Sequence, residues 1–275
     1  MLSENLRTEL VSAVRVAARE RILPRFRALA PGDVHTKSGP ADLVTRADTE
    51  AEAQITAAIR AVWPEAEVLG EEAVAADHAL RARMGAAEWA VVIDPVDGTW
   101  NFAKGLPLFG SMVSVLHHGQ PVWGMLYDPV SDDWIEAGDG AATVFARASD
   151  RHPVRTSDEA RAPRLNGYVP LGLFARDTRL RLSQDMVAFA RATSLRCACH
   201  EYRMLAQGSV EFLLSGPVPH PWDHAAGALC VVRAGGVVRF LDGTPYDANR
   251  RKGVLLAAAS PAVWDDLAGR FAYLA

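Results

Sequence analysis

The chain has 275 residues, of which 49% are hydrophobic and 23% are charged, a balance typical of a globular protein with a sizeable core. The formal net charge of −4, without a long basic run, argues against a nucleic acid polymer or a membrane surface as partner. No stretch reaches the roughly 18 apolar residues of a membrane span, and the N-terminal sequence MLSENLRTEL has no signal-peptide core. We therefore expect a cytoplasmic protein.

The first ninety residues predict helices separated by turns. Ser3 can cap an amphipathic helix that ends near Pro24. A second helix, with Ile55 and Ile59 on its apolar face, closes at Pro64. The other elements expected here are a turn-rich loop with Lys37 over residues 31–42, a strand over 67–69 and an alanine-rich helix over 73–87.

From residue 89 the hydrophobic period changes from helical to strand-like. The run WAVVID predicts a buried strand that ends in an acidic turn. Two pairs of apolar segments, separated by Gly119-Gln120 and by Asp139-Gly140, predict hairpins. The first half is thus expected to be α+β, with helices packed on an antiparallel or mixed sheet.

A polar segment over residues 148–165 is the best candidate for a boundary between subdomains. Strand and helix patterns alternate after it, which favours an α/β second half. We expect halves 1–150 and 151–275 that form one compact catalytic unit. The elements expected after the boundary are strands near 165–169, 195–199, 211–215, 237–241 and 254–259 and helices near 178–192, 200–207 and 223–234.

Three acidic clusters stand at strand ends or helix starts. They contain Glu71, the pair Asp94 and Asp97 around Pro95, and Asp223. Each cluster alone also fits an ordinary solvated turn or, for Asp223, a helix N-cap. Together they suggest a cation site, because gathered carboxylates repel one another and Mg²⁺ prefers oxygen ligands.

Gly98 and Thr99 follow the second acidic cluster directly, and their backbone N–H groups can cradle an anion. Metal ligands and an anion cradle in one turn indicate phosphate chemistry. The segment DPVDGTWNF over 94–102 resembles the signature of the inositol monophosphatase family, and WDHAAGALCVVRAGG over 222–236 resembles its C-terminal signature. The acidic turn at 70–72, the segment DLVTRAD over 42–48 and the preceding Lys37 are similar to further family motifs in the family's order.

This resemblance implies a layered αβαβα sugar-phosphatase-like fold and a phosphatase that acts on a small phosphomonoester such as an inositol or sugar phosphate. It also implies two or three Mg²⁺ ions per active site, inhibition by Li⁺ and a homodimer. A metal-activated water would attack the phosphorus. The family's metal ligands match Glu71, Asp94, the carbonyl of Val96, Asp97 and Asp223; its phosphate-binding amides match Gly98 and Thr99; its catalytic positions match Asp48, Thr99 and Glu71.

Several positions depart from the inositol-specific pattern. Trp100 replaces a small hydroxyl residue at the rim, and Ser215 and Gly216 stand where a substrate-binding glutamate is usual. His200 and Glu201 replace small residues and are expected to border the leaving-group side of the pocket. The pattern therefore argues against inositol phosphate as the preferred substrate.

Alternative substrates are histidinol phosphate, fructose 1,6-bisphosphate and a nucleotide 3′-phosphate. A non-catalytic binding protein would be expected to lack a ligand, whereas Asp48, Glu71, Asp94, Asp97 and Asp223 are all present. A P-loop hydrolase is excluded by the lack of its glycine-lysine motif.

Overall fold

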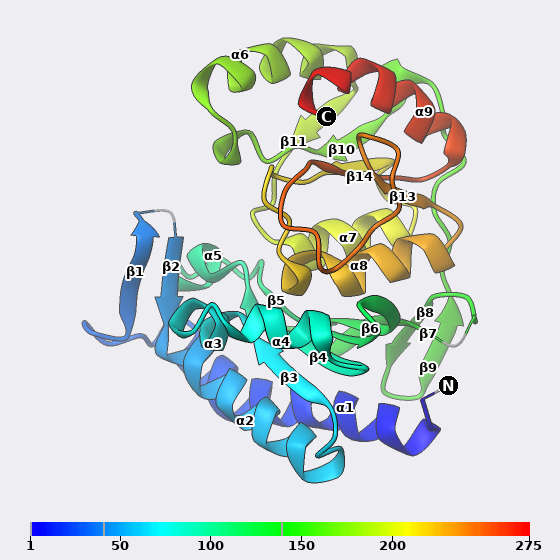
Figure 1. The fold of residues 1–275 in the computed structure, drawn as a ribbon. Coiled ribbons are helices and arrows are strands. Elements are labelled where there is room, and N and C mark those ends of the chain that lie inside the picture. The colour runs from blue at the N-terminus through cyan, green and yellow to red at the C-terminus, as the bar shows by residue number, and fades with distance from the viewer. Residues whose placement is uncertain (1, 41, 139) are drawn as a thin grey trace.

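The computed structural model describes residues 2–40, 42–138 and 140–275. Five layers of alternating helix and sheet build the molecule, as Figure 1 shows. A helical layer covers one face of a seven-stranded sheet, a second helical layer separates this sheet from a five-stranded sheet, and a third covers the top. This is the αβαβα arrangement that the family resemblance implies.

Helices occupy three of these layers. α1 and α2 form the lowest layer, α7 and α8 the central one, and α6 and α9 the uppermost (Figure 1). The hydroxyl of Ser3 accepts a hydrogen bond from the Leu6 amide at 3.1 Å, so the predicted cap of α1 is present. The helices are α1 Glu4–Ala17, α2 Arg46–Val62, α3 Glu71–Ala76, α4 Leu80–Ala86, α5 Thr99–Ala103, α6 Arg176–Asp185, α7 Ala198–Ala206, α8 Pro221–Arg233 and α9 Pro261–Arg270.

Strands form three sheets of different character. The seven-stranded sheet has the order β3-β4-β5-β6-β7-β8-β9 and is mixed, because only β3 and β4 pair in parallel. The five-stranded sheet has the order β11-β10-β12-β14-β13, and β1 pairs with β2 alone. The strands are β1 Val34–Gly39, β2 Asp42–Thr45, β3 Glu67–Gly70, β4 Trp89–Asp97, β5 Gly110–His117, β6 Gln120–Asp128, β7 Asp133–Gly138, β8 Val144–Arg147, β9 Asp150–Pro153, β10 Asn166–Tyr168, β11 Arg191–Thr193, β12 Phe212–Leu214, β13 Val237–Phe240 and β14 Leu255–Ala258.

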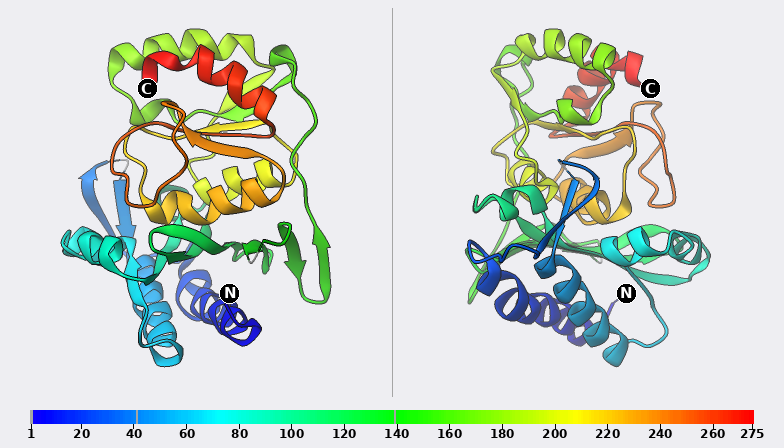
Figure 2. Two further views of the ribbon diagram at one scale, coloured as in Figure 1. Left: turned by 45° about the vertical axis from the view of Figure 1, so that its right-hand side comes forward. Right: turned by 90° about the vertical axis from the view of Figure 1, so that its left-hand side faces the viewer.

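Four sequence-based element assignments are wrong. The expected loop over residues 31–42 contains the hairpin strand β1. The β1–β2 hairpin projects from the lower layers toward the upper half (Figure 2). It was assigned as a loop because its sequence lacks the apolar alternation of a buried strand. The alanine-rich segment forms two short helices, because the carboxylate of Asp77 accepts the Ala79 amide and ends the first. No strand forms over 195–199, because Arg196 has a φ of 55° and α7 already begins at Ala198. The helix expected near 178–192 ends at Asp185, and residues 191–193 form β11 instead.

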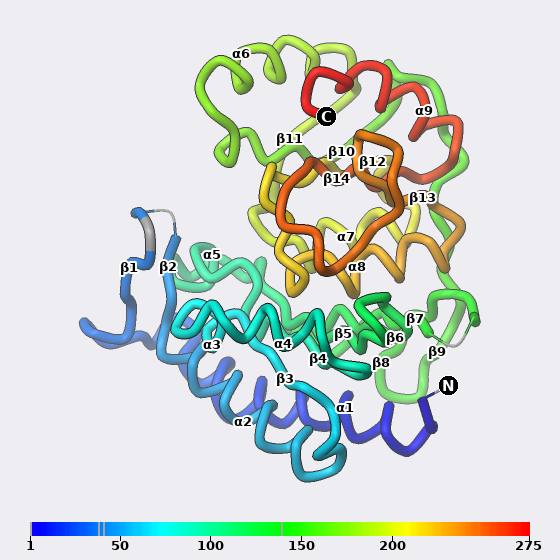
Figure 3. Tube along the Cα trace, in the orientation of Figure 1, coloured from blue at the N-terminus to red at the C-terminus, as the bar shows by residue number. Residues whose placement is uncertain are grey.

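Buried side chains fill the spaces between the layers. The cluster between the two sheets combines residues from both predicted halves, such as Leu116 with Tyr202 and Leu229. The chain rises from the lower sheet to the upper one after β9, which the trace in Figure 3 makes easy to follow. In the described part of the chain, no helix has both the length and the apolar character needed to cross a membrane.

Candidate active site

The turn at the end of β4 presents two buried carboxylates. The pairing with β5 shifts register between Asp94 and Asp97, so this part of β4 is a bulge, where proline is tolerated. The Ser111 hydroxyl donates to the Pro95 carbonyl at 2.7 Å, and the Val96 amide donates to Asp94 Oδ1 at 3.1 Å. These bonds fix the turn and orient its acidic side chains.

Three carboxylates from distant segments converge beside this turn. Glu71 begins α3, Asp94 lies near the end of β4, and Asp223 lies in the first turn of α8. One carboxylate oxygen from each lies within 4.8 Å of the others. We call these three residues the acidic triad. The N-cap of α8 is His220, so Asp223 is not the simple cap that its position in the sequence allowed.

The charges of the triad favour a bound cation. Burial, reinforced by the neighbouring carboxylates of Glu71, Asp97 and Asp223, raises the pKa of Asp94 well above its usual range. Burial likewise raises the pKa of Asp223. A divalent ion would relieve this repulsion and stabilise the ionised forms, so the donor set fits a hard cation bound through oxygen.

Lys37 supplies one positive charge at the edge of the triad. Its ammonium lies 2.7 Å from a carboxylate oxygen of Glu71 and 2.7 Å from one of Glu72. Burial, together with the charge of Glu71, raises the pKa of Glu72 to about 8. The ammonium pairs with Glu71 and Glu72 and, together with Arg81, only partly offsets the charge of Asp223, whose pKa stays well above its usual range.

Asp97 lies beside the triad and also holds the start of α7 by hydrogen bonds. Its Oδ2 accepts the Cys199 amide at 2.5 Å and lies 3.0 Å from Cys197 Sγ. The carboxylate therefore caps the start of α7. All three cysteines are buried and free. Neither Asp97 nor the Val96 carbonyl belongs to the acidic triad, although Asp97 lines the same cavity.

Asp48 and Thr99 form a direct hydrogen-bonded pair. Thr99 Oγ1 lies 3.0 Å from Asp48 Oδ1 and 2.9 Å from the Val96 carbonyl. Asp48 Oδ2 accepts the amide and the hydroxyl of Thr45, which belong to the capping box of α2. Burial raises the pKa of Asp48 to about 7. The cap holds one oxygen of Asp48 and leaves the other for Thr99.

Gly98 makes the step from β4 into α5 possible. Its φ is 84°, and a Cβ there would lie 2.8 Å from the Leu108 carbonyl. Gly98 is the N-cap of α5 and Thr99 is its first residue. Amides at these positions have no acceptor within the helix, which suits them to an anion.

Glu52 supports the site and was not predicted from the sequence. Its two carboxylate oxygens accept the amides of Glu72 and Ala73, each at 2.8 Å, and thereby fix the start of α3 that carries Glu71. A Cβ at Gly70 would lie 1.9 Å from Glu52 Cδ, so this approach requires glycine. The available signal was a charged residue one helical turn after Asp48 on an apolar helix face.

A cavity of about 710 Å³ opens above the acidic triad. We call the acidic part of its lining the floor and the largely apolar part the wall; Asp42, Thr193, Ser194 and Arg196 also line the cavity. The Arg196 guanidinium stacks over the Trp100 ring at 4.1 Å at its rim. The floor is lined by Glu71, Asp94, Asp97, Gly98, Thr99 and Asp223, and the wall by Trp100, Val169, Pro170, Leu171, Leu173 and Met186.

The two predicted substrate residues occupy different places. Glu201 lines an adjoining cavity of about 400 Å³, where its carboxylate accepts the Ser194 hydroxyl at 3.0 Å and the Leu195 amide at 2.7 Å. Burial raises the pKa of Glu201 to about 7. His200 Nε2 lies 3.1 Å from the Phe109 carbonyl, and His200 is not among the described residues that line either cavity.

Ser215 is already engaged in the backbone around it. Its hydroxyl donates to the Gly216 carbonyl at 2.7 Å and accepts the Leu255 amide at 2.8 Å. Gly216 packs so close to Leu173 that a Cβ would lie 2.8 Å from Leu173 Cδ1. This segment offers the cavity no charged acceptor.

Comparisons with known proteins agree with this geometry. The model of the inositol monophosphatase family matches residues 3–271. A probable inositol 1-monophosphatase, ImpA, from Mycobacterium tuberculosis is 31% identical over 247 residues, covering 86% of this chain and 84% of that protein. A fructose-1,6-bisphosphatase/inositol-1-monophosphatase from Thermotoga maritima is 28% identical over 216 residues, 78% of each chain. The solved structure of the extragenic suppressor protein suhB from Bartonella henselae has a TM-score of 0.80 and 25% identity, covering 97% of this chain and 98% of that one.

The layered fold and its buried acidic site define a metal-dependent phosphatase that acts on phosphomonoesters. The chain belongs to the inositol monophosphatase family.

Proposed function

We propose that the metal is Mg²⁺, with two or three ions held by Glu71, Asp94, the Val96 carbonyl, Asp97 and Asp223. The observation that carries this proposal is the convergence of the acidic triad, whose oxygens lie within 4.8 Å of one another. Bound Mg²⁺ supplies a more acidic water and stabilises charge on the oxygens that attack and leave phosphorus. Glu71 would help to hold that water.

The remaining polar residues would position the phosphate and accept a proton. The amides of Gly98 and Thr99 would bind phosphate oxygens at the start of α5. The Thr99 hydroxyl would take a proton from the attacking water and pass its own proton to Asp48 Oδ1, 3.0 Å away. Because one hydroxyl donates to one acceptor at a time, a cation bound at the Val96 carbonyl would favour donation to Asp48.

For the substrate, we infer a phosphomonoester whose leaving group carries a planar or apolar ring. The leaving group would lie against Trp100, Leu171 and Leu173, the apolar part of a lining that also contains Asp42, Thr193, Ser194 and Arg196. A polyol such as inositol needs partners for several hydroxyls. Among the alternatives, histidinol phosphate and a nucleotide 3′-phosphate suit this wall better than inositol 1-phosphate or fructose 1,6-bisphosphate.

Comparing kcat/KM for histidinol phosphate, adenosine 3′-phosphate, fructose 1,6-bisphosphate, inositol 1-phosphate and glycerol 2-phosphate tests this substrate proposal. We expect a ring-bearing compound to rank first. Trp100→Thr should lower its kcat/KM about tenfold, the value of a lost apolar contact, and leave glycerol 2-phosphate unchanged. Val187→Asn is the matched control, because Val187 is 85% exposed and outside the residues that line the cavity. Inositol 1-phosphate as the best substrate would refute the proposal.

Glu201→Gln tests the second part of the pocket in the same assay. The carboxylate borders the side cavity and receives two hydrogen bonds, so its loss should alter the substrate ranking if the leaving group reaches this cavity. An unchanged ranking and unchanged rates would show that Glu201 only supports the turn before α7.

Inhibition by Li⁺ is the third part of the proposal. The complete set of acidic ligands supports it, because a small monovalent cation could replace a catalytic Mg²⁺ without supplying the same charge. A Li⁺ titration at fixed Mg²⁺ should reduce phosphate release, whereas a KCl titration should not. Equal curves for the two salts would count against lithium sensitivity.

We further propose a cytoplasmic homodimer in which residues 1–150 and 151–275 work as one catalytic unit. A symmetric dimer is the commonest soluble oligomer, and buried residues from both halves share one cluster between the sheets. Light scattering at micromolar concentration should return twice the chain mass of 29.7 kDa. A mass equal to one chain would refute the dimer.

A further inference from the structure

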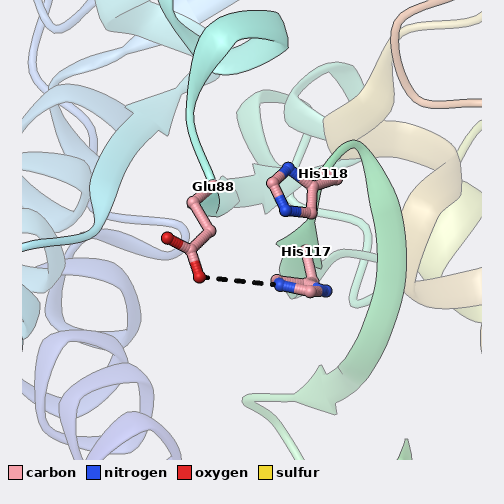
Figure 4. Close-up of side chains that lie close together, drawn as sticks. All are labelled: Glu88, His117 and His118. Carbon is pink, nitrogen blue, oxygen red and sulfur yellow. Dashed lines mark ion pairs between the residues drawn. The ribbon is translucent and has the colours of Figure 1, made fainter.

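A second group of metal-binding side chains lies away from the acidic triad. Glu88 precedes β4, His117 ends β5, and His118 opens the turn into β6. One ligand atom from each lies within 4.8 Å of the others, and Figure 4 shows the three side chains projecting toward one another. We propose that these residues form a surface site for Zn²⁺ or another imidazole-binding transition metal.

The backbone brings the three side chains together in a defined way. Adjacent residues of a strand normally point to opposite faces. His118 has a φ of 48°, so the chain leaves the strand conformation there, and its ring centroid lies only 4.4 Å from that of His117. The His118 amide donates to the Glu88 carbonyl at 2.8 Å and ties the two segments. The site is therefore built from two joined pieces of backbone.

The side chains are accessible and only partly constrained. The carboxylate of Glu88 lies 3.8 Å from His117 Nε2, with 66% and 38% of the respective side chains exposed. The His117 ring packs on Trp89 at 4.2 Å between centroids, which limits its rotation. Small rotations of exposed side chains would bring two nitrogens and one oxygen to the roughly 2.0–2.2 Å bonds of Zn²⁺ and leave a fourth position to water.

The ligand types separate this site from the acidic triad. Imidazole nitrogen suits Zn²⁺, Cu²⁺ and Ni²⁺, whereas carboxylates alone suit Mg²⁺. β4 runs between the two sites from Trp89 to Asp94, six residues whose five steps span about 17 Å at strand rise. One chain would thus bind hard and softer divalent ions at opposite ends of a single strand. An ion here would clamp the segment before β4 to the β5–β6 turn.

Calorimetric titration of Zn²⁺ into the full chain, in a large excess of Mg²⁺ that occupies the acidic site, tests the proposal. We expect one Zn²⁺ per chain. His117→Ala and His118→Asn should each weaken binding by at least about 100-fold, because even an outer-shell partner is worth about 10–100-fold. Asparagine tolerates the left-handed backbone of position 118, so this second variant separates ligand loss from misfolding.

His152→Ala is the matched control. His152 is exposed and pairs with Asp150 at 3.2 Å, and this imidazole and carboxylate have no third candidate ligand among the described residues. This variant should bind Zn²⁺ as the wild type does. With Co²⁺ as probe, the wild type should show the visible absorption of a tetrahedral ion, and His118→Asn should not. Zn²⁺ binding that is absent in excess Mg²⁺, or equal in the wild type and both histidine variants, would overturn the proposal.

Discussion

Asp94→Asn is expected to lower kcat about 10³-fold or more while the protein stays folded. Asp94 is the most deeply buried member of the acidic triad, at 2% exposure, and the neighbouring carboxylates raise its pKa. An amide keeps the Oδ1 acceptor for the Val96 amide but removes the negative charge that a divalent ion needs. A loss of several kcal/mol of charge stabilisation in the transition state corresponds to the expected fall in kcat, because about 1.4 kcal/mol changes a rate tenfold.

The same change should leave stability intact without metal. In a chelator the wild-type triad keeps its mutual repulsion, whereas the asparagine variant loses part of it. We therefore expect the Tm of the variant in chelator to equal or exceed that of the wild type. Added Mg²⁺ should raise the Tm of the wild type more than the Tm of the variant. Asp150→Asn, an exposed change on β9, is the control for both readouts. Full activity in Asp94→Asn, or a collapsed fold, would contradict this assignment.

Thr99→Val is expected to lower kcat about 100-fold with little change in KM. Valine keeps the shape and the backbone amide of Thr99 but removes the hydroxyl that lies 3.0 Å from Asp48 Oδ1. Positioned proton transfer contributes about 10²–10⁴ to rate. Thr99→Ser should recover most of the activity because it restores the hydroxyl. Steady-state kinetics of these two variants on one substrate give the comparison.

Asp48→Asn and Thr49→Val complete the test of the proton relay. The first keeps an acceptor for Thr99 but removes the base, so its kcat should fall as in Thr99→Val, and the double variant should be no worse than either single one. Thr49→Val removes a hydroxyl at the adjacent exposed position and should behave as wild type. Among the described contacts, this hydroxyl donates a hydrogen bond only to the Arg46 carbonyl. Additive losses in the double variant would argue against a shared relay.

Local turn chemistry made the acidic positions predictable. The sequence predicts an acidic turn after the buried strand, and the structure has this turn as a bulge around Pro95 followed by Gly98 in a left-handed conformation. The short helix that starts at Thr99 was not predicted. The grouping of Glu71, Asp94 and Asp223 was different, because their separation in the chain carries no distance information. The positions of these carboxylates at strand ends and helix starts suggested a shared cation site, and the resemblance of ordered motifs to a family identified them as its ligands.

Long-range contacts account for what the sequence did not predict. Glu52 and Lys37 each contact residues at the start of α3 that lie 20 or more positions away in the sequence. Asp97 contacts Cys197, about 100 positions away, just before α7. The β1–β2 hairpin was assigned as a loop because its strands pair only with each other and bury few side chains. Most of the apolar wall, from Val169 to Leu173, lies in the irregular segment around Leu171, where periodicity gives no signal.

The most direct test of metal-dependent phosphatase activity is phosphate release by the purified wild-type chain. Protein freed of metal by a chelator should be assayed on the panel of phosphomonoesters before and after addition of Mg²⁺. We predict no release above background in the chelator and restored release with Mg²⁺ on at least one substrate, with Asp94→Asn inactive under both conditions. Equal release with and without the metal, or no release from any substrate when Mg²⁺ is present, would contradict the account.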